Sequence, residues 1–149
     1  MKQEDKELLL KDLSARLPYG VKIRIIHHEI KGADPEYVDD VFSTTYYNMI
    51  DYDDDNYEFL PYLRPMSSMT EEEKDEMFGI CTLSNCSVNS NWEFVGVEIM
   101  SSHPRYGDHY STDYSVIDWL NKNMFDYRGL IPKGLALEAP EDMYKEEQQ

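Results

Sequence analysis

The first part of the chain changes from a helical to a strand-like pattern of apolar positions. Leu9 and Leu13 lie on one face of a leucine-rich segment with polar residues between them, which predicts a helix over residues 4–17. Pro18 ends that helix, because proline lacks a backbone N–H. Apolar and basic side chains then alternate over residues 21–25, as they do in a strand with one wet face.

Two further segments favour strands. Beyond Ile25 the apolar positions shift parity, which predicts either a bulge there or a strand covered on both faces. Residues 41–50 are rich in β-branched and aromatic side chains, which predicts a second strand, and residues 57–60 are predicted as a short third strand that Pro61 ends. Three strands with tight links after a helix predict a small, strongly curved antiparallel sheet. An SH3-like barrel is one form of it.

A second helix begins near residue 70. Thr70 can cap its first turn while Glu73 reaches back to the Thr70 N–H, and both favour a helix start. Gly79 predicts that this helix is short. Residues 80–83 and 92–100 then have the composition of strands.

The C-terminal third combines an amphipathic helix with an apolar closing segment. Asp113 can cap the helix, Trp119 lies at the edge of its apolar face, and Gly129 suits the helix exit. The apolar face consists of Val116, Ile117, Leu120 and Met124. Residues 141–149 are polar and form a frayed tail. We therefore expect one α+β domain over residues 1–149, in which an N-terminal and a C-terminal helix pack on the sheet.

Length and composition exclude several classes of protein. A chain of 149 residues with 41% hydrophobic residues can build a core, whereas its longest apolar runs of three residues cannot span a membrane. The acidic N-terminus does not resemble a signal peptide, so we expect a cytoplasmic protein that does not contact membranes. Cys81 and Cys86 match no zinc spacing, which favours a buried or idle pair of thiols and no cofactor.

Negative charge is concentrated in the middle of the chain. The whole chain has 14 basic and 30 acidic residues, a formal charge of −16. Residues 34–76 contain fourteen of the acids and only two bases. Because nucleic-acid binding requires a basic patch, this distribution excludes direct binding to DNA or RNA.

Two groups of residues are weak candidates for a metal site. Asp51, Asp53 and Asp55 occupy the first, third and fifth positions of a calcium-loop pattern. The pattern then fails, because Asn56 replaces the required glycine and Tyr62 the bidentate glutamate. A solvated loop is the better interpretation.

The second group lies within a loop that we expect over residues 101–110. His103, Asp108 and His109 could approach one another there, which leaves open a small metal-dependent hydrolase. Their spacing matches no ligand signature. The chain also lacks a nucleophile elbow, a phosphate-binding glycine loop and a zinc-protease motif, so we expect no enzyme activity.

Tyrosines among the acids suggest a binding surface. Twelve tyrosines occur in the chain, and Tyr46, Tyr47, Tyr52, Tyr57 and Tyr62 lie in the acidic region. Tyrosine provides a large contact area at small entropic cost. We therefore expect a protein partner to bind a face formed by Tyr46, Tyr47, Asp51, Asp53, Asp54, Asp55 and Tyr57. The alternative is a DNA mimic, whose ordered carboxylates would occupy the basic groove of a host defence or nucleic-acid enzyme.

Three segments carry a resemblance to a known family. They are residues 7–26 with LPYGV, residues 60–76 with PYLRPMSSMTEEEK, and residues 117–144 with IDWLNK, DYRGLIP and APEDMY. The chain resembles short acidic proteins of prophages and mobile elements from gut anaerobic bacteria. That family has no assigned reaction, ligand or partner. The resemblance thus implies an accessory protein of a phage or mobile element and transfers no site residue.

Overall fold

The protein contains two compact units. The computed structural model describes the backbone of residues 1–28, 32, 34–52, 56–83, 92–95, 98–103, 107–111 and 114–145, and the side chains of these residues outside 78–115. One unit is Met1–Arg64 with Leu130–Gln149, and the other is Pro65–Gly129. Within the described residues, four helices combine with a four-stranded mixed sheet and a three-stranded one. The predicted α+β class is confirmed.

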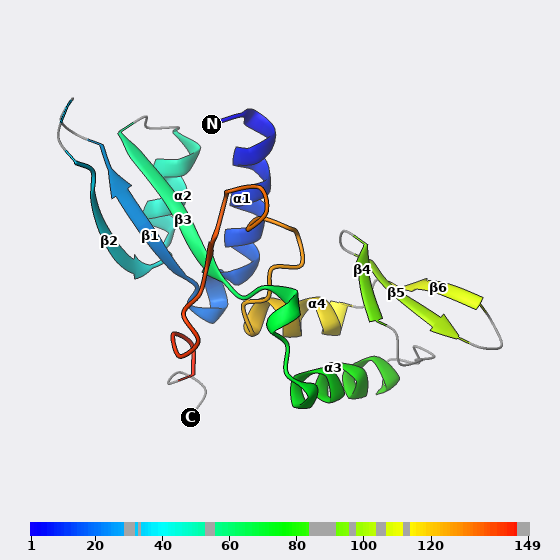
Figure 1. Ribbon diagram of the computed structural model, residues 1–149. Helices are drawn as coiled ribbons and strands as arrows, with labels where there is room; N and C mark the ends of the chain where they lie inside the picture. Colours follow the sequence, from blue (N-terminus) through cyan, green and yellow to red (C-terminus); the bar gives the residue numbers. More distant parts are fainter. Residues whose placement is uncertain are drawn as a thin grey trace. The chain divides into compact units, whose positions relative to one another are not determined.

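The first unit is built on the four-stranded sheet. Its strands are β1 (Lys22–His27), β2 (Glu36–Val41), β3 (Tyr57–Leu63) and β7 (Leu137–Glu138), in the spatial order β2-β1-β3-β7. β1 pairs antiparallel with β2 and β3, whereas β7 runs parallel to β3. The sheet is open, with β2 and β7 at its edges, and is not closed into an SH3-like barrel (Figure 1).

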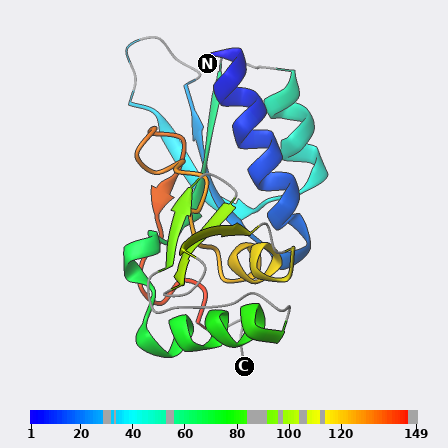
Figure 2. The same cartoon turned by 90° about the vertical axis from the view of Figure 1, so that its right-hand side faces the viewer.

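Two helices cover one side of this sheet. They are α1 (Gln3–Arg16), which confirms the predicted N-terminal helix, and α2 (Thr44–Asp51). Both lie on the same side of the strands (Figures 1 and 2). The sheet and the helices contribute buried apolar side chains: Leu9, Leu10, Leu13, Ile23, Ile25, Ile50, Phe59 and Leu63. The helices therefore close a core against β1 and β3.

β1 is regular and partly covered on both faces. Its register with β2 runs without interruption from Lys22 opposite Val41 to His27 opposite Glu36, so there is no bulge at Ile25. Alternate β1 residues such as Ile25 are buried towards the helices, whereas the residues between them are half-buried. The parity shift in the sequence thus reflects a strand with two partly covered faces.

Tyr144 ties the C-terminal segment to the sheet. Its hydroxyl donates to the Tyr62 carbonyl (2.7 Å) and accepts from the Lys22 N–H (3.1 Å). Lys22 and Tyr62 belong to the neighbouring strands β1 and β3, so one side chain bridges both. Tyr144 is buried within the segment expected to fray, and residues 146–149 of that segment lie outside the described residues.

The second unit combines helices with an antiparallel sheet. Its elements are α3 (Glu71–Leu83), β4 (Trp92–Val95), β5 (Glu98–His103), β6 (Gly107–Ser111) and α4 (Tyr114–Lys122), after a short turn of 3₁₀ helix, η2 (Met66–Ser68). The three strands are ordered β4-β5-β6. A strand-like pattern over residues 92–100 is thus two strands of a hairpin. Residues 101–110, expected as a loop, include the end of β5 and most of β6.

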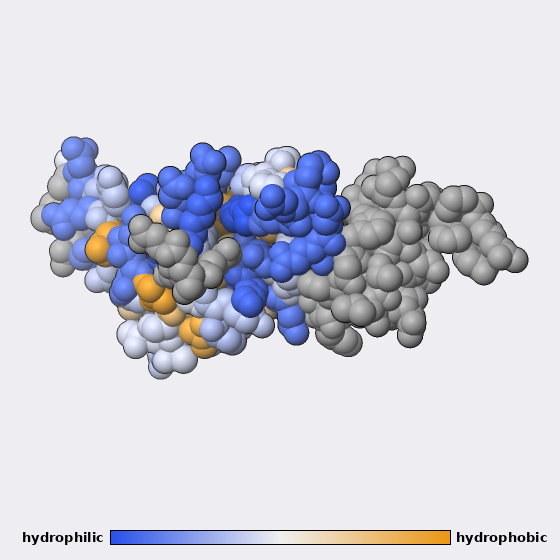
Figure 3. Space-filling view, turned by 90° about the horizontal axis from the view of Figure 1, so that it is seen from below, coloured by the Kyte–Doolittle hydropathy of each residue, from blue (hydrophilic) through white to orange (hydrophobic). Residues whose placement is uncertain are grey.

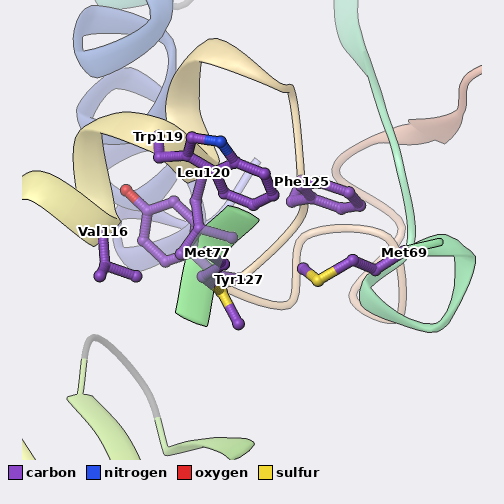
Figure 4. Close-up of a cluster of buried hydrophobic side chains, with 7 residues drawn as sticks. All are labelled: Met69, Met77, Val116, Trp119, Leu120, Phe125 and Tyr127. Carbon is purple, nitrogen blue, oxygen red and sulfur yellow. The ribbon is translucent and has the colours of Figure 1, made fainter. Parts of the chain in front are cut away.

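The buried cluster of this unit combines side chains of α4 with those of the segments packed against it (Figure 4). Its members are Met69, Met77, Val116, Trp119, Leu120, Phe125 and Tyr127, which we name the α4 cluster. The Trp119 ring, 7% exposed, stacks on Phe125 with centroids 5.6 Å apart. The predicted core-facing helix is confirmed.

The predicted start of α3 can be followed in its hydrogen bonds, whereas Asp113, the predicted cap of α4, lies outside the described residues. The Thr70 hydroxyl accepts from the Glu73 N–H (3.1 Å), and the Glu73 carboxylate accepts from the Thr70 N–H (3.0 Å). This reciprocal pair confirms the predicted start of α3. At the end of α4, the Met124 N–H donates to the Asn121 carbonyl and the Phe125 N–H to that of Leu120.

These two bonds at the end of α4 form a Schellman motif, which places a residue in the left-handed region. That residue is Met124, with φ of +63°, although glycine is the usual occupant. The helix therefore ends before Phe125. Gly129 has the predicted positive φ of +75° but lies beyond the exit, in a later turn.

Several sequence-based predictions of individual elements are wrong. Residues 41–50 are mostly the helix α2, and the second strand is the acidic segment Glu36–Val41. Aromatic and β-branched residues have only a weak strand preference. Burial of Ile50 in the core of the first unit outweighs that preference. Similarly, residues 80–83 continue α3 through Gly79, because one glycine costs a helix only about 1 kcal/mol.

Pro61 does not end β3, which continues to Leu63. The His28 N–H donates to the Asn56 carbonyl (2.7 Å), so hydrogen-bonded pairs between β1 and β3 fall on alternate positions from there. Pro61 lies opposite Ile23, at a position between such pairs. Its missing N–H therefore removes no bond to β1.

Candidate functional site

Among the strands whose side chains the structure describes, β2 is the one exposed along its whole length. All six of its residues are exposed, although three of them are apolar or aromatic. Tyr37 is 65% exposed, Val38 60% and Val41 46%. Acids separate and flank them, since residues 34–41 contain four acids and no base. An edge strand of this kind combines apolar contact area with negative charge.

Among the described strands, the backbone of β2 pairs with a neighbour on one side only. The Phe42 N–H donates to the Val21 carbonyl (2.8 Å), so hydrogen-bonded pairs with β1 recur at Asp40, Val38 and Glu36. The residues between them turn their N–H and C=O groups away from β1. β2 ends the strand order of the sheet, and no described strand lies beyond it.

Asp40 closes part of that outer edge. Its carboxylate accepts from the Val41 N–H (2.8 Å) and from the Tyr46 hydroxyl. These two hydrogen bonds, that of Tyr46 first, hold the pKa of Asp40 below its usual value. The same contact raises the pKa of Tyr46. Asp40 is therefore charged and fixed in position at neutral pH.

Asp39 anchors a polar network on the other face of the strand. Arg24 lies opposite it and donates to its carboxylate (3.3 Å), and the Tyr62 hydroxyl donates to the same oxygen (2.9 Å). Burial, together with that hydrogen bond, raises the pKa of Tyr62. The Arg24 guanidinium also lies 4.3 Å from the centre of the Tyr37 ring. This network fixes the Tyr37 ring over the sheet while most of its surface stays in solvent.

The tyrosines predicted to form the binding face are not equivalent. Tyr46 is engaged with Asp40, and Tyr57 stacks on His27 with centroids 4.4 Å apart. Tyr47 is 36% exposed and borders a shallow hollow of about 410 Å³ together with residues of α1. Tyr52, at the end of α2, is 87% exposed. The described tyrosine that sits on an edge strand beside exposed valines is Tyr37, which the sequence reasoning missed.

The predicted acidic residues are only partly described. Asp51 is the last residue of α2, and its carbonyl accepts from the Lys6 ammonium (2.9 Å). Asp53, Asp54 and Asp55 lie outside the described residues. Asp39 and Asp40 are engaged in hydrogen bonds rather than standing free in a row. The DNA-mimic hypothesis stays a prediction.

The histidine group lies on adjacent strands. His109 of β6 pairs with Ser101 of β5, two positions from His103, whereas Asp108 pairs with Ser102 and so has the opposite parity. The side chains of these residues are not among those described. The structure thus brings the two histidine positions near each other in the ladder, and the hydrolase hypothesis stays a prediction.

The described residues contain neither a metal-binding group of side chains nor a membrane-spanning helix. No group of three or more His, Cys, Asp or Glu side chains among them is placed to hold a metal ion. None of the helices in the described part of the chain combines the length and the apolar character needed to cross a membrane. The side chains of Cys81 and Cys86 are outside the described set.

Apolar surface is dispersed on the face shown in Figure 3. Its hydrophobic atoms, in orange, form small separate patches among hydrophilic ones. Among the residues with exposed large hydrophobic side chains, three belong to β2: Tyr37, Val38 and Val41.

Comparisons of the chain with protein families, with curated proteins and with solved structures find no match. The resemblance to prophage proteins stays a prediction, and the arguments about function depend on the residues themselves.

Proposed function

We propose that this protein is a non-enzymatic binding protein that presents β2 to a protein partner. The surface involved, which we name the β2 surface, consists of Tyr37, Val38, Asp39, Asp40 and Val41. The observation that carries the proposal is the exposure of Tyr37, Val38 and Val41 on an acidic edge strand. Apolar side chains within a charged rim are typical of protein-binding surfaces. A role as an accessory protein of a phage or mobile element is supported by the sequence resemblance.

Charge defines the kind of partner. The chain has a formal charge of −16, and no base occurs between residues 34 and 41. A partner with a basic surface would be attracted over several ångströms and would associate quickly at low salt. Since a Debye length is about 8 Å at physiological ionic strength, the association rate would fall as salt is raised. The apolar residues would then retain the partner once it is bound.

The experiment is affinity capture from the cells that naturally contain the chain, at low and high salt. The wild-type protein is compared with a variant that carries Tyr37→Ser and Val38→Ser. The matched control is Tyr52→Ser, because Tyr52 is even more exposed but directly follows α2, away from β2 in the sequence.

We expect one protein to be captured by the wild type and the control, more strongly at low salt, and to be lost from the double variant. Both substitutions are at exposed positions, so circular dichroism should show an unchanged fold. Equal capture by the wild type and the double variant would refute a binding role for the β2 surface.

A further inference from the structure

We propose that the outer edge of β2 accepts a short, basic, extended segment of a protein partner, which adds to the sheet as another strand. This inference rests on the proposed binding function and specifies how the β2 surface is used. Strand addition combines backbone hydrogen bonds, which give affinity, with contacts of alternate side chains, which give specificity.

The open part of the edge is short and bounded at both ends. The backbone groups of Tyr37, Asp39 and Val41 turn away from β1, as the alternation of hydrogen-bonded pairs requires. The Val41 N–H is occupied by the Asp40 carboxylate. At the other end Pro35 has the same parity as Tyr37 but carries no N–H. Within the part of the chain that the structure describes, two outward donors therefore have no partner, those of Tyr37 and Asp39, with carbonyls beside them.

A window of this size favours a short occupant. The two outward N–H groups, two residues apart, can donate to the carbonyls of two residues that are two positions apart on an incoming strand. With one further residue at each end, the contact spans about five residues. Proline and an occupied N–H at the ends of an edge limit uncontrolled strand pairing. β2 thus has the features of an edge that admits a brief strand and resists a long one.

The side chains of β2 specify what the incoming strand should carry. Glu36, Val38 and Asp40 are at alternate positions and so share one face of the strand, where Val38 is the apolar residue between two acids. Residues directly opposite in paired strands lie on the same face, where opposite charges attract and like charges repel. The complementary strand should therefore carry basic residues opposite Glu36 and Asp40 and an apolar residue opposite Val38, with any residue at the two positions between them. That pattern is symmetric and fits in either direction.

The same charge argues against a second copy of this chain as the occupant. Pairing two β2 edges would bring together two segments that each hold four acids and no base. Like charges at directly opposite positions destabilise a strand pair. A basic partner removes this repulsion and neutralises Glu36 and Asp40 together.

The direct test uses a defined peptide and the full chain. The probe is a capped seven-residue peptide with the core Lys-Thr-Val-Thr-Lys, added to ¹⁵N-labelled protein and followed by amide hydrogen exchange. We expect exchange at the Tyr37 and Asp39 amides to slow by about tenfold when about nine-tenths of the protein is bound. The Val38 and Asp40 amides, already paired with β1, should change little.

A matched pair of variants separates the backbone from the side chain. Tyr37→Thr removes the ring but keeps the outward N–H, whereas Tyr37→Pro removes both and leaves the pairs with β1 intact. We expect Tyr37→Pro to bind the peptide about tenfold more weakly than Tyr37→Thr, the effect of one lost hydrogen bond. Should Tyr37→Pro fail to fold, the wild type with an N-methylated core peptide should show the same loss.

Two controls test the charge and the occupant. A core of Glu-Thr-Val-Thr-Glu should bind at least about tenfold more weakly than the lysine peptide, because it repels the β2 acids. Sedimentation of the chain alone should show no self-association through this edge. Equal binding of both cores, or a dimer abolished by Tyr37→Pro, would overturn the choice of a basic occupant.

The outcome also separates this inference from the proposed function. If Tyr37→Thr and Tyr37→Pro weaken binding equally and no amide gains protection, strand addition is refuted while side-chain binding at β2 survives. If the Tyr37→Ser and Val38→Ser variant still captures its partner, the proposed function itself is lost, whatever the peptide does.

Discussion

The α4 cluster and β2 contain similar side chains in opposite environments. Val116 and Tyr127 of the α4 cluster are 0% and 4% exposed, whereas Val38 and Tyr37 of β2 are 60% and 65% exposed. Residue type does not explain this difference. α4 packs against other segments of its own unit, whereas among the described strands β2 has a neighbour on one side only. Apolar residues left at such an edge serve stability little, which is why we assign them to binding.

The sharpest test of this comparison removes one apolar side chain from each region. Leu120→Ala, in the α4 cluster, should lower the free energy of unfolding by about 2–5 kcal/mol, because it opens a cavity at a fully buried site. Val38→Ala on β2 should cost less than about 1 kcal/mol. Urea unfolding followed by tryptophan fluorescence and by circular dichroism measures both. A larger loss from Val38→Ala than from Leu120→Ala would contradict the assignment.

A second test removes one hydroxyl from each region. The Tyr127 hydroxyl donates to the Asn121 side-chain oxygen (2.9 Å), and both residues are buried. Tyr127→Phe should lower the free energy of unfolding by about 1–2 kcal/mol, because it takes a donor from a buried acceptor. Tyr46→Phe removes the hydroxyl bonded to Asp40 at the surface, where water can replace it. It should leave the unfolding midpoint nearly unchanged, and a comparable shift in the two variants would argue that β2 is not a solvated edge.

The smallest expected effect is a change in the titration of Asp40. Its pKa is lowered in the folded protein, so its contribution to stability is present above the ordinary value of 3.8 and is lost as pH falls through the folded pKa. Tyr46→Phe should move the Asp40 pKa upward, towards that ordinary value. The shift should be incomplete, since the Val41 N–H still donates to the carboxylate. Carboxyl carbon shifts in an NMR titration measure it, and an unmoved pKa would show that Tyr46 does not hold Asp40.

The helices of this protein could be predicted better than its strands. The leucine spacing of α1, the reciprocal Thr70 and Glu73 bonds and the apolar face around Trp119 depend on neighbours within one or two turns. Local signals of this kind are readable in the sequence. β2 was missed because three of its six residues are acids, which have low strand preference, and because its pairing with β1 involves residues up to nineteen positions apart.

The candidate site was only partly predictable for a related reason. The sequence located the acidic, tyrosine-bearing region but selected Tyr46, Tyr47 and Tyr57 within it. Tyrosine count does not show how far each ring is exposed. Tyr46 and Tyr57, which contact Asp40 and His27, are half-buried, whereas Tyr37 is 65% exposed although Arg24 lies over its ring. Exposed Tyr37 could be recognised only once β2 was placed at an edge.

The amino-acid sequence alone determined the α+β class, the capped start of α3, the burial of Trp119 and the gathering of negative charge in residues 34–76. These properties follow from local periodicity, capping and composition. Tertiary structure decided that residues 44–51 form a helix, that β3 passes through Pro61 and that β2 ends the strand order of the described sheet. Each of these depends on contacts between distant segments, whose burial and hydrogen bonds outweigh local preferences of about 1 kcal/mol or less.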